Sequence, residues 1–186
     1  GTFTLKGDTA QKSVATAIAL GYRLIDTAAI YGNEEAVGAG IRQSGVDRSA
    51  LFITTKLWES DSGYENAKKA FATSLKKLGV DYVDLYLIHW PRGDIKGSWK
   101  AMEELYDAGK IKAIGVSNFE PGQLAELMKT DRITPTVNQI ESHPFFQQQE
   151  AQEANRKRGI QVKAWSPFAQ GRNKPFTNPT LVATGK

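Results

Sequence analysis

Four side chains capable of acid–base chemistry lie at or just beyond the ends of short apolar segments. Asp26, Lys56 and His89 each close such a segment, and Tyr31 follows Asp26 after a short loop. Taken singly, each has a structural explanation: a helix cap for Asp26, a surface position for Lys56, packing for Tyr31 and a hydrogen-bonded core imidazole for His89. Their common position favours a shared role, because the carboxyl ends of barrel strands meet at one mouth.

A phenol, an ammonium, a carboxylate and an imidazole at one mouth suit carbonyl reduction, because the developing alkoxide must be protonated as hydride arrives. A free phenol has a pKa of about 10, so Tyr31 becomes a better acid if a cation stabilises its phenolate. At about 4 Å and an effective dielectric constant of about 20, Lys56 would contribute roughly 4 kcal/mol before desolvation is subtracted. Asp26 would keep that ammonium charged and oriented. His89 would donate a hydrogen bond to the substrate oxygen.

These side chains require a framework of alternating strands and helices. Short β-branched and apolar runs predict strands at 22–26, 51–56, 83–89, 111–116, 136–140 and 160–165. Amphipathic stretches predict helices at 9–19, 34–43, 64–78, 97–108, 121–129 and 147–158. Asn33 is expected to cap the second helix, and Gly79, Gly109 and Gly159 follow expected helix ends.

Strict alternation of strand and helix predicts parallel strands joined by right-handed crossovers, in either an open doubly wound sheet or a closed barrel. No Gly-x-Gly-x-x-Gly sequence follows a predicted strand, so a dinucleotide would not be bound as in a Rossmann fold. A barrel is therefore favoured. The length of 186 residues suits a single domain.

Composition narrows the functional class. A hydrophobic content of 40% with 24% charged residues is typical of a globular protein. The net charge of +4 comes from scattered groups such as Arg156-Lys157-Arg158 at an expected helix end, so we expect no nucleic-acid partner. No apolar run predicts a membrane span and no leader is visible. The absence of cysteine agrees with a cytoplasmic location and, with few histidines, gives no support for a metal site. No feature specifies an oligomeric state.

Six segments spanning most of the chain carry a family pattern: GYRLIDTAAIYGNEE at 21–35, TTKLW at 54–58, DLYLIHWP at 84–91, GVSNF at 115–119, VNQIE at 137–141 and AWSP at 164–167. In this order they resemble the aldo-keto reductases, and within them the small bacterial diketogluconate reductase-like members. The resemblance implies a (β/α)8 TIM barrel and a reductase that transfers hydride from NADPH, with NADH as an alternative, to a small carbonyl substrate. It implies Tyr31 as the proton donor, Lys56 and Asp26 as the pair that tunes it, and His89 as the group that polarises the carbonyl.

The same resemblance implies a nicotinamide site. Ser117, Asn118 and Gln139 would hydrogen-bond the carboxamide, and Trp165 would lie beneath the ring, although a barrel-core position is its structural alternative. On the pyrophosphate side, the loop after the last predicted strand would contribute Ser166, Phe168 and Gln170.

Aromatic residues match the family's substrate pocket. Phe3, Trp58 and Trp90 would form walls around the mouth, as in apolar pockets with few polar groups, or serve only in packing. His143 precedes Pro144, and we interpret it as a loop-stabilising residue.

The resemblance begins at Gly1-Thr2-Phe3, expected to end the first barrel strand, and stops within the helix expected after the seventh strand. The family's N-terminal hairpin, eighth strand, C-terminal loop and the basic segment that binds the adenosine 2′-phosphate are not among these residues. We therefore expect a single (β/α)-barrel domain over residues 1–186 that is incomplete at both ends.

Two other function classes fit parts of the pattern. A binding or regulatory protein could retain the cofactor site with negligible turnover. A barrel lyase could instead use Lys56 as a Schiff-base amine, but Ser117, Asn118 and Gln139 would then have no purpose.

Overall fold

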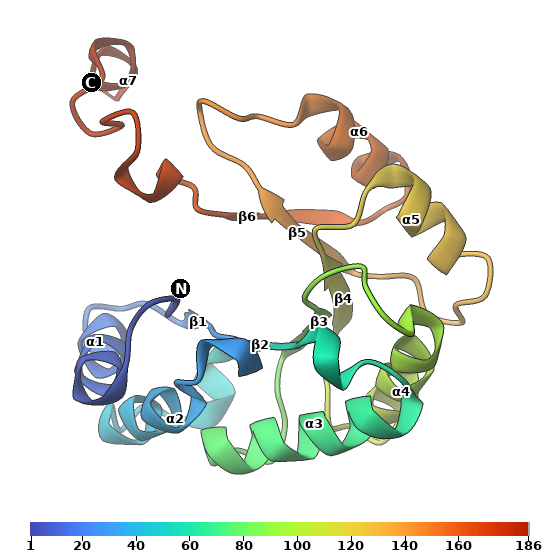
Figure 1. Cartoon of the computed structure of the whole chain (residues 1–186). Coiled ribbons are helices and arrows are strands. Elements are labelled where there is room, and N and C mark those ends of the chain that lie inside the picture. The colour runs from blue at the N-terminus through green and yellow to red at the C-terminus, as the bar shows by residue number, and fades with distance from the viewer. Residues whose placement is uncertain (186) are drawn as a thin grey trace.

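The computed structural model describes residues 1–185 and contains a sheet of six parallel strands (Figure 1). The strands are β1 (Leu24–Asp26), β2 (Phe52–Leu57), β3 (Leu85–Ile88), β4 (Ile114–Ser117), β5 (Val137–Glu141) and β6 (Gln161–Trp165). Each strand pairs with the next one along the chain. The sheet curls as part of a barrel does, and the helices other than the C-terminal one lie around its outer side (Figure 1). The expected barrel architecture is thus confirmed over these strands.

The helices alternate with the strands, and all but the last of them were predicted by the hydrophobic periodicity. They are α1 (Gly7–Ala19), α2 (Glu34–Gln43), α3 (Tyr64–Leu78), α4 (Ile95–Asp107), α5 (Pro121–Leu127), α6 (Gln149–Lys157) and α7 (Pro179–Thr184). The expected helix ends at Gly79, Gly109 and Gly159 are confirmed, because all three glycines adopt positive φ angles. None of the helices in the described residues is long and apolar enough to cross a membrane.

The main hydrophobic core lies between the helices and the sheet. Val37, Phe71 and Trp99 project from three successive helices and pack with strand residues such as Ile53 and Tyr86. Burying one such large side chain contributes about 1.5 to 3 kcal/mol relative to exposure. This layer holds the strands side by side and so places the residues at their carboxyl ends.

Two expectations about local structure were wrong. Gly1-Thr2-Phe3 form no strand; Thr2 instead donates one backbone hydrogen bond to the carbonyl of Asp26 at 2.9 Å. Asn33 does precede α2, but its side chain does not cap that helix. Its amide donates to the carbonyls of Thr2 and Leu5 at 2.8 and 2.9 Å. Through these two hydrogen bonds, Asn33 holds the N-terminal segment in place beside β1.

Helix α2 packs closely against its neighbours through glycine. A Cβ atom added at Gly38 would lie 2.1 Å from the backbone oxygen of Leu78, at the end of α3. We expect Gly38→Ala to lower the free energy of unfolding by about 2 kcal/mol, because two backbones would have to separate. Urea denaturation measures this change. The control Gly122→Ala meets no neighbouring atom within 4 Å and should leave stability unchanged or slightly higher. Equal effects of the two substitutions would contradict the packing argument.

Candidate active site

Asp26 and Lys56 form a buried ion pair at the carboxyl ends of β1 and β2. The Nζ of Lys56 donates to Oδ1 of Asp26 at 2.6 Å and to the carbonyl of Thr27 at 2.8 Å. Burial alone would raise the pKa of Asp26, but the charges of Lys56 and Lys163 outweigh burial and hold that pKa well below its usual range. Asp26 is therefore a carboxylate at neutral pH and keeps the ammonium of Lys56 oriented.

Tyr31 ends a short 3₁₀ helix, Ala29–Tyr31, that follows β1. Its hydroxyl lies 3.5 Å from the Nζ of Lys56, and its ring packs against Phe3 with ring centres 5.1 Å apart. Burial, and after it the negative charge of Asp26, raises the pKa of Tyr31 above its ordinary value. The phenol is therefore protonated at neutral pH and available as a proton donor.

The net direction of this pKa shift was open from the sequence. The sequence led us to expect that Lys56 favours the phenolate before the cost of desolvation is subtracted, and burial together with Asp26 raises the pKa of Tyr31. The physical reason is that the phenol loses water on burial and faces Asp26 as well as the ammonium. That Lys56 offsets part of this rise stays a prediction.

His89 follows β3, and its imidazole lies beside Tyr31 and Trp58. The ring centres are 5.8 Å apart in the first pair and 5.2 Å in the second, both edge-to-face. Burial, followed by the charge of Lys56, lowers the pKa of His89 to about 4, with Asp26 acting in the opposite direction. His89 is thus neutral at physiological pH and can donate one hydrogen bond without carrying charge.

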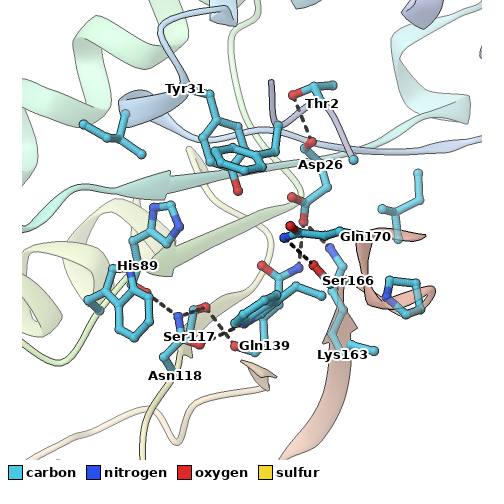
Figure 2. Close-up of a pocket in the computed structure, with 18 of the residues that line it drawn as sticks. Thr2, Asp26, Tyr31, His89, Ser117, Asn118, Gln139, Lys163, Ser166 and Gln170 are labelled. Carbon is cyan, nitrogen blue, oxygen red and sulfur yellow. Dashed lines mark hydrogen bonds and ion pairs between the residues drawn. The ribbon is translucent and has the colours of Figure 1, made fainter. Parts of the chain in front are cut away.

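Sequence reasoning missed Lys163 in β6. Its Nζ donates to Oδ2 of Asp26 at 2.7 Å, so Asp26 contacts a second lysine (Figure 2). The strand pattern carried a signal: Lys163 lies two residues before Trp165, so the alternation of side chains puts both on one face of β6.

The residues expected to hold a nicotinamide are linked by hydrogen bonds (Figure 2). Ser117 donates its hydroxyl to the backbone oxygen of Gln139 at 2.8 Å, and the amide of Asn118 donates to Ser117 and to the carbonyl of His89, both at 3.1 Å. The indole of Trp165 donates to Oδ1 of Asn118 at 2.8 Å. Asn118 adopts a left-handed φ of 62°, which turns its side chain toward this network.

Gln139 connects this network to the ion pair. Its Nε2 donates to Oδ2 of Asp26 at 2.9 Å, and the residue is almost fully buried. The polar residues on β4 and β5 therefore share one hydrogen-bonded cluster with the acid–base residues on β1 and β2.

The loop after β6 brings two of its three expected residues to the site. Ser166 and Gln170 line the same cavity, and the amide of Gln170 donates to the Ser166 hydroxyl at 3.0 Å. Phe168 does not line it: its side chain is 60% exposed and packs against Phe176, with ring centres 5.3 Å apart. A role for Phe168 in this site has no support from the arrangement of the described residues.

A cavity of about 600 Å³ is lined by most of these residues; Lys56 lies behind its wall, paired with Asp26. Phe3, Trp58 and Trp90 are among its walls, as expected for substrate-facing residues, together with Tyr31 and His89. An apolar wall around a few polar groups is typical of sites for small organic ligands.

The second histidine of the chain, His143, lies in the loop after β5. His143 lies 3.3 Å from Glu141 and pairs by backbone hydrogen bonds with Phe146, which agrees with a loop-stabilising role. Within residues 1–185, no group of three histidine, cysteine or acidic side chains could hold a metal ion.

Known proteins are similar to this chain in sequence and in architecture. Residues 1–180 match the family described as Aldo/keto reductase family. Glyoxal reductase of Bacillus subtilis (strain 168) is 55% identical over 166 residues, which cover 89% of this chain and 60% of that protein. The chain thus spans about 60% of the length of this curated relative.

Solved structures of aldo-keto reductases are also similar to this chain. An aldo-keto reductase enzyme from a Medee basin deep-sea metagenome library has a TM-score of 0.95 at 45% identity, covering 98% of this chain and 68% of that one. A Bombyx mori aldo-keto reductase in complex with NADP has a TM-score of 0.89 at 37% identity, covering 100% and 69%. Because the family match extends over nearly all the residues that build this fold and site, the chain belongs to the aldo/keto reductase family.

Proposed function

We propose that this chain carries the active site of a reductase that transfers hydride from NADPH to the carbonyl carbon of an aldehyde, a ketone, or a dicarbonyl or keto-sugar. The observation that carries the proposal is that Asp26, Tyr31 and a neutral His89 line one cavity, with Lys56 in contact with both Asp26 and Tyr31. One similar protein is named a glyoxal reductase, and glyoxal is a dicarbonyl, which supports that part of the substrate range.

The polar residues of the cavity fit a nicotinamide. Ser117, Asn118 and Gln139 bring hydroxyl and amide groups, which can both donate to and accept from a carboxamide, and Trp165 brings a flat apolar surface. Ser166 and Gln170 would lie on the pyrophosphate side. When bound, the reduced nicotinamide supplies the hydride. A related structure was solved with NADP, which supports the choice of cofactor.

Tyr31 donates the proton in this proposal. Its raised pKa keeps the hydroxyl protonated, and the ammonium of Lys56 at 3.5 Å favours the phenolate that remains after transfer. His89, neutral because of burial, donates a hydrogen bond that orients the carbonyl and stabilises the developing oxyanion. Phe3, Trp58 and Trp90 exclude water around the reacting carbon.

The same contacts favour a reductase over the two other function classes, a Schiff-base lyase and a binding or regulatory protein. A Schiff-base lyase needs a free amine at Lys56, but its Nζ donates to Asp26, Thr27 and Tyr31. A binding or regulatory protein has no need for an acid-base cluster at the mouth of the cavity.

Loss of absorbance at the reduced-nicotinamide band tests the proposal. Full-length protein, NADPH and a reactive aromatic aldehyde should consume the cofactor in proportion to enzyme. A binding protein would instead perturb NADPH fluorescence without consuming it. If the protein binds NADPH without consuming it, or does neither, the proposed reductase is refuted.

We expect Asn118→Ala to weaken NADPH binding about fivefold, because a lost hydrogen bond is worth on the order of 1 kcal/mol. The substitution also frees the indole of Trp165, so the quenching of tryptophan fluorescence should become smaller. Titration of the full-length protein with NADPH measures both. Asn66→Ala, on the outer surface of α3, serves as the control. An unchanged dissociation constant in Asn118→Ala would place Asn118 outside the cofactor site.

A further inference from the structure

Lys163 is a charged side chain of the cavity to which the proposed function gives no role. It reaches from β6, the last strand of the sheet, to Asp26 at the end of β1, the first. Its Nζ contacts Oδ2 of Asp26 at 2.7 Å and the hydroxyl of Thr54 at 3.3 Å. The side chain is only 21% exposed, so its charge is poorly screened by water.

The two lysines divide the carboxylate between them. Lys56 contacts Oδ1. Lys163 contacts Oδ2, with Gln139 as a further donor to Oδ2 (Figure 2). Lys56 and Asp26 alone would form a neutral pair. With Lys163 the cluster carries one surplus positive charge, which a phenolate at Tyr31 would neutralise.

We propose that Lys163 is a positioning residue that shares Asp26 with Lys56 and thereby makes Tyr31 a stronger acid. The inference rests on the proposed role of Tyr31 as proton donor. Lys163 occupies the carboxylate oxygen that Lys56 does not use, so the negative charge of Asp26 acts less strongly on the phenol. The ammonium of Lys56 can then stabilise the phenolate of Tyr31 with less opposition from the charge of Asp26.

The charged and titratable groups around Tyr31 come from four parts of the chain. They are Asp26 of β1, Lys56 of β2, His89 after β3, and Lys6 before α1, whose ammonium contacts the backbone oxygen of Tyr31. His89 is neutral, and burial together with Asp26 raises the pKa of Tyr31. Lys163 opposes that rise from the far side of the carboxylate.

The test compares Lys163→Met with Lys163→Arg in the full-length protein. Oxidation of an alcohol by NADP⁺ requires the phenolate of Tyr31, so its rate rises with pH toward the pKa of that group. A charge on the order of 10 Å away at an effective dielectric constant of about 20 shifts a pKa by about one unit. Lys163→Met should therefore move the rising limb of the pH profile to higher pH by about one unit. At pH values below that limb, the rate of alcohol oxidation should be about tenfold lower than in the wild type. Lys163→Arg should keep the wild-type profile.

Lys112→Met is the matched control, because it also removes a lysine paired with a carboxylate, 3.3 Å from Asp84 and away from the cavity. Its pH profile should stay unchanged. A merely structural role of Lys163 would lower the rate at every pH without moving the limb. Superimposable limbs for wild type and Lys163→Met, or equal shifts in the Met and Arg variants, would overturn the proposal.

A second measurement needs no turnover. After a rapid jump to about pH 10, where lysine is still mostly charged, tyrosinate absorbance relative to a Tyr31→Phe partner reports the ionised fraction of Tyr31 before alkaline unfolding. That fraction should fall about tenfold in Lys163→Met. If the wild-type protein reduces no carbonyl, the proposed function fails while this titration still decides the effect of Lys163.

Discussion

Tyr31→Phe should lower carbonyl reduction by at least about a hundredfold while leaving NADPH affinity unchanged. The substitution removes the hydroxyl that lies 3.5 Å from Lys56, and loss of a general acid usually costs a factor of about a hundred or more. The ring and its packing against Phe3 remain, so folding should be unaffected. Single-turnover measurements at saturating NADPH isolate the chemical step from product release.

Combining Tyr31→Phe with Lys56→Met shows whether the two side chains act as one unit. If Lys56 acts through the phenol, the double variant should be no slower than the slower single variant. If the rate losses of the two single variants multiply in the double variant, Lys56 contributes by another route. Turnover of Tyr31→Phe near the wild-type rate would remove Tyr31 from the mechanism.

Asp26→Asn should be the most destabilising substitution in the site, lowering the free energy of unfolding by about 3 to 5 kcal/mol. The carboxylate accepts from Lys56, Lys163 and Gln139 in a largely buried position. An amide would leave the buried ammonium of Lys56 and the half-buried ammonium of Lys163 without a counter-charge and would place its own donors against theirs. Urea denaturation at neutral pH measures the loss.

Asp107→Asn is the appropriate control, because Asp107 pairs with Arg132 at the surface, where both side chains are more than half exposed. An exposed pair contributes less than about 1 kcal/mol. The pH dependence gives a second check. The pKa of Asp26 is depressed in the folded state, so its stabilisation is complete above the unfolded value of about 4 and is lost as the pH falls below it. The Asp26→Asn variant should lack this acid-sensitive component. A loss no larger than that of Asp107→Asn would contradict the buried cluster.

The alternation of strands and helices was readable from the sequence because the strands contain short β-branched and apolar runs and the helices are amphipathic. All four residues of β3 are buried, and Gly79 ends α3 in the left-handed conformation that side chains disfavour. Local patterns failed where distant contacts decide the structure. Asn33 looks like a helix cap, yet its hydrogen bonds run to Thr2 and Leu5, which no local rule connects to it.

Part of the site could be predicted from the sequence, because residues at the carboxyl ends of neighbouring parallel strands lie close together. Asp26, Lys56 and His89 were identified because each closes a strand, and the structure brings them together. The sign of the Tyr31 shift was not predictable, since it depends on how fully the phenol is buried. Lys163 was missed because it lies within β6 rather than at its end, so only its alternation with Trp165 marked it.

The matching order of strands in the chain and in the sheet has a consequence for synthesis. Each strand finds its partner one crossover away, so most pairing is local and can proceed as the chain leaves the ribosome. The contact between Asp26 and Lys163 is different, because it joins residues 137 positions apart. A nascent chain can thus form the Asp26 and Lys56 pair early, and we expect it to complete the charge balance of the cluster only once β6 has been made.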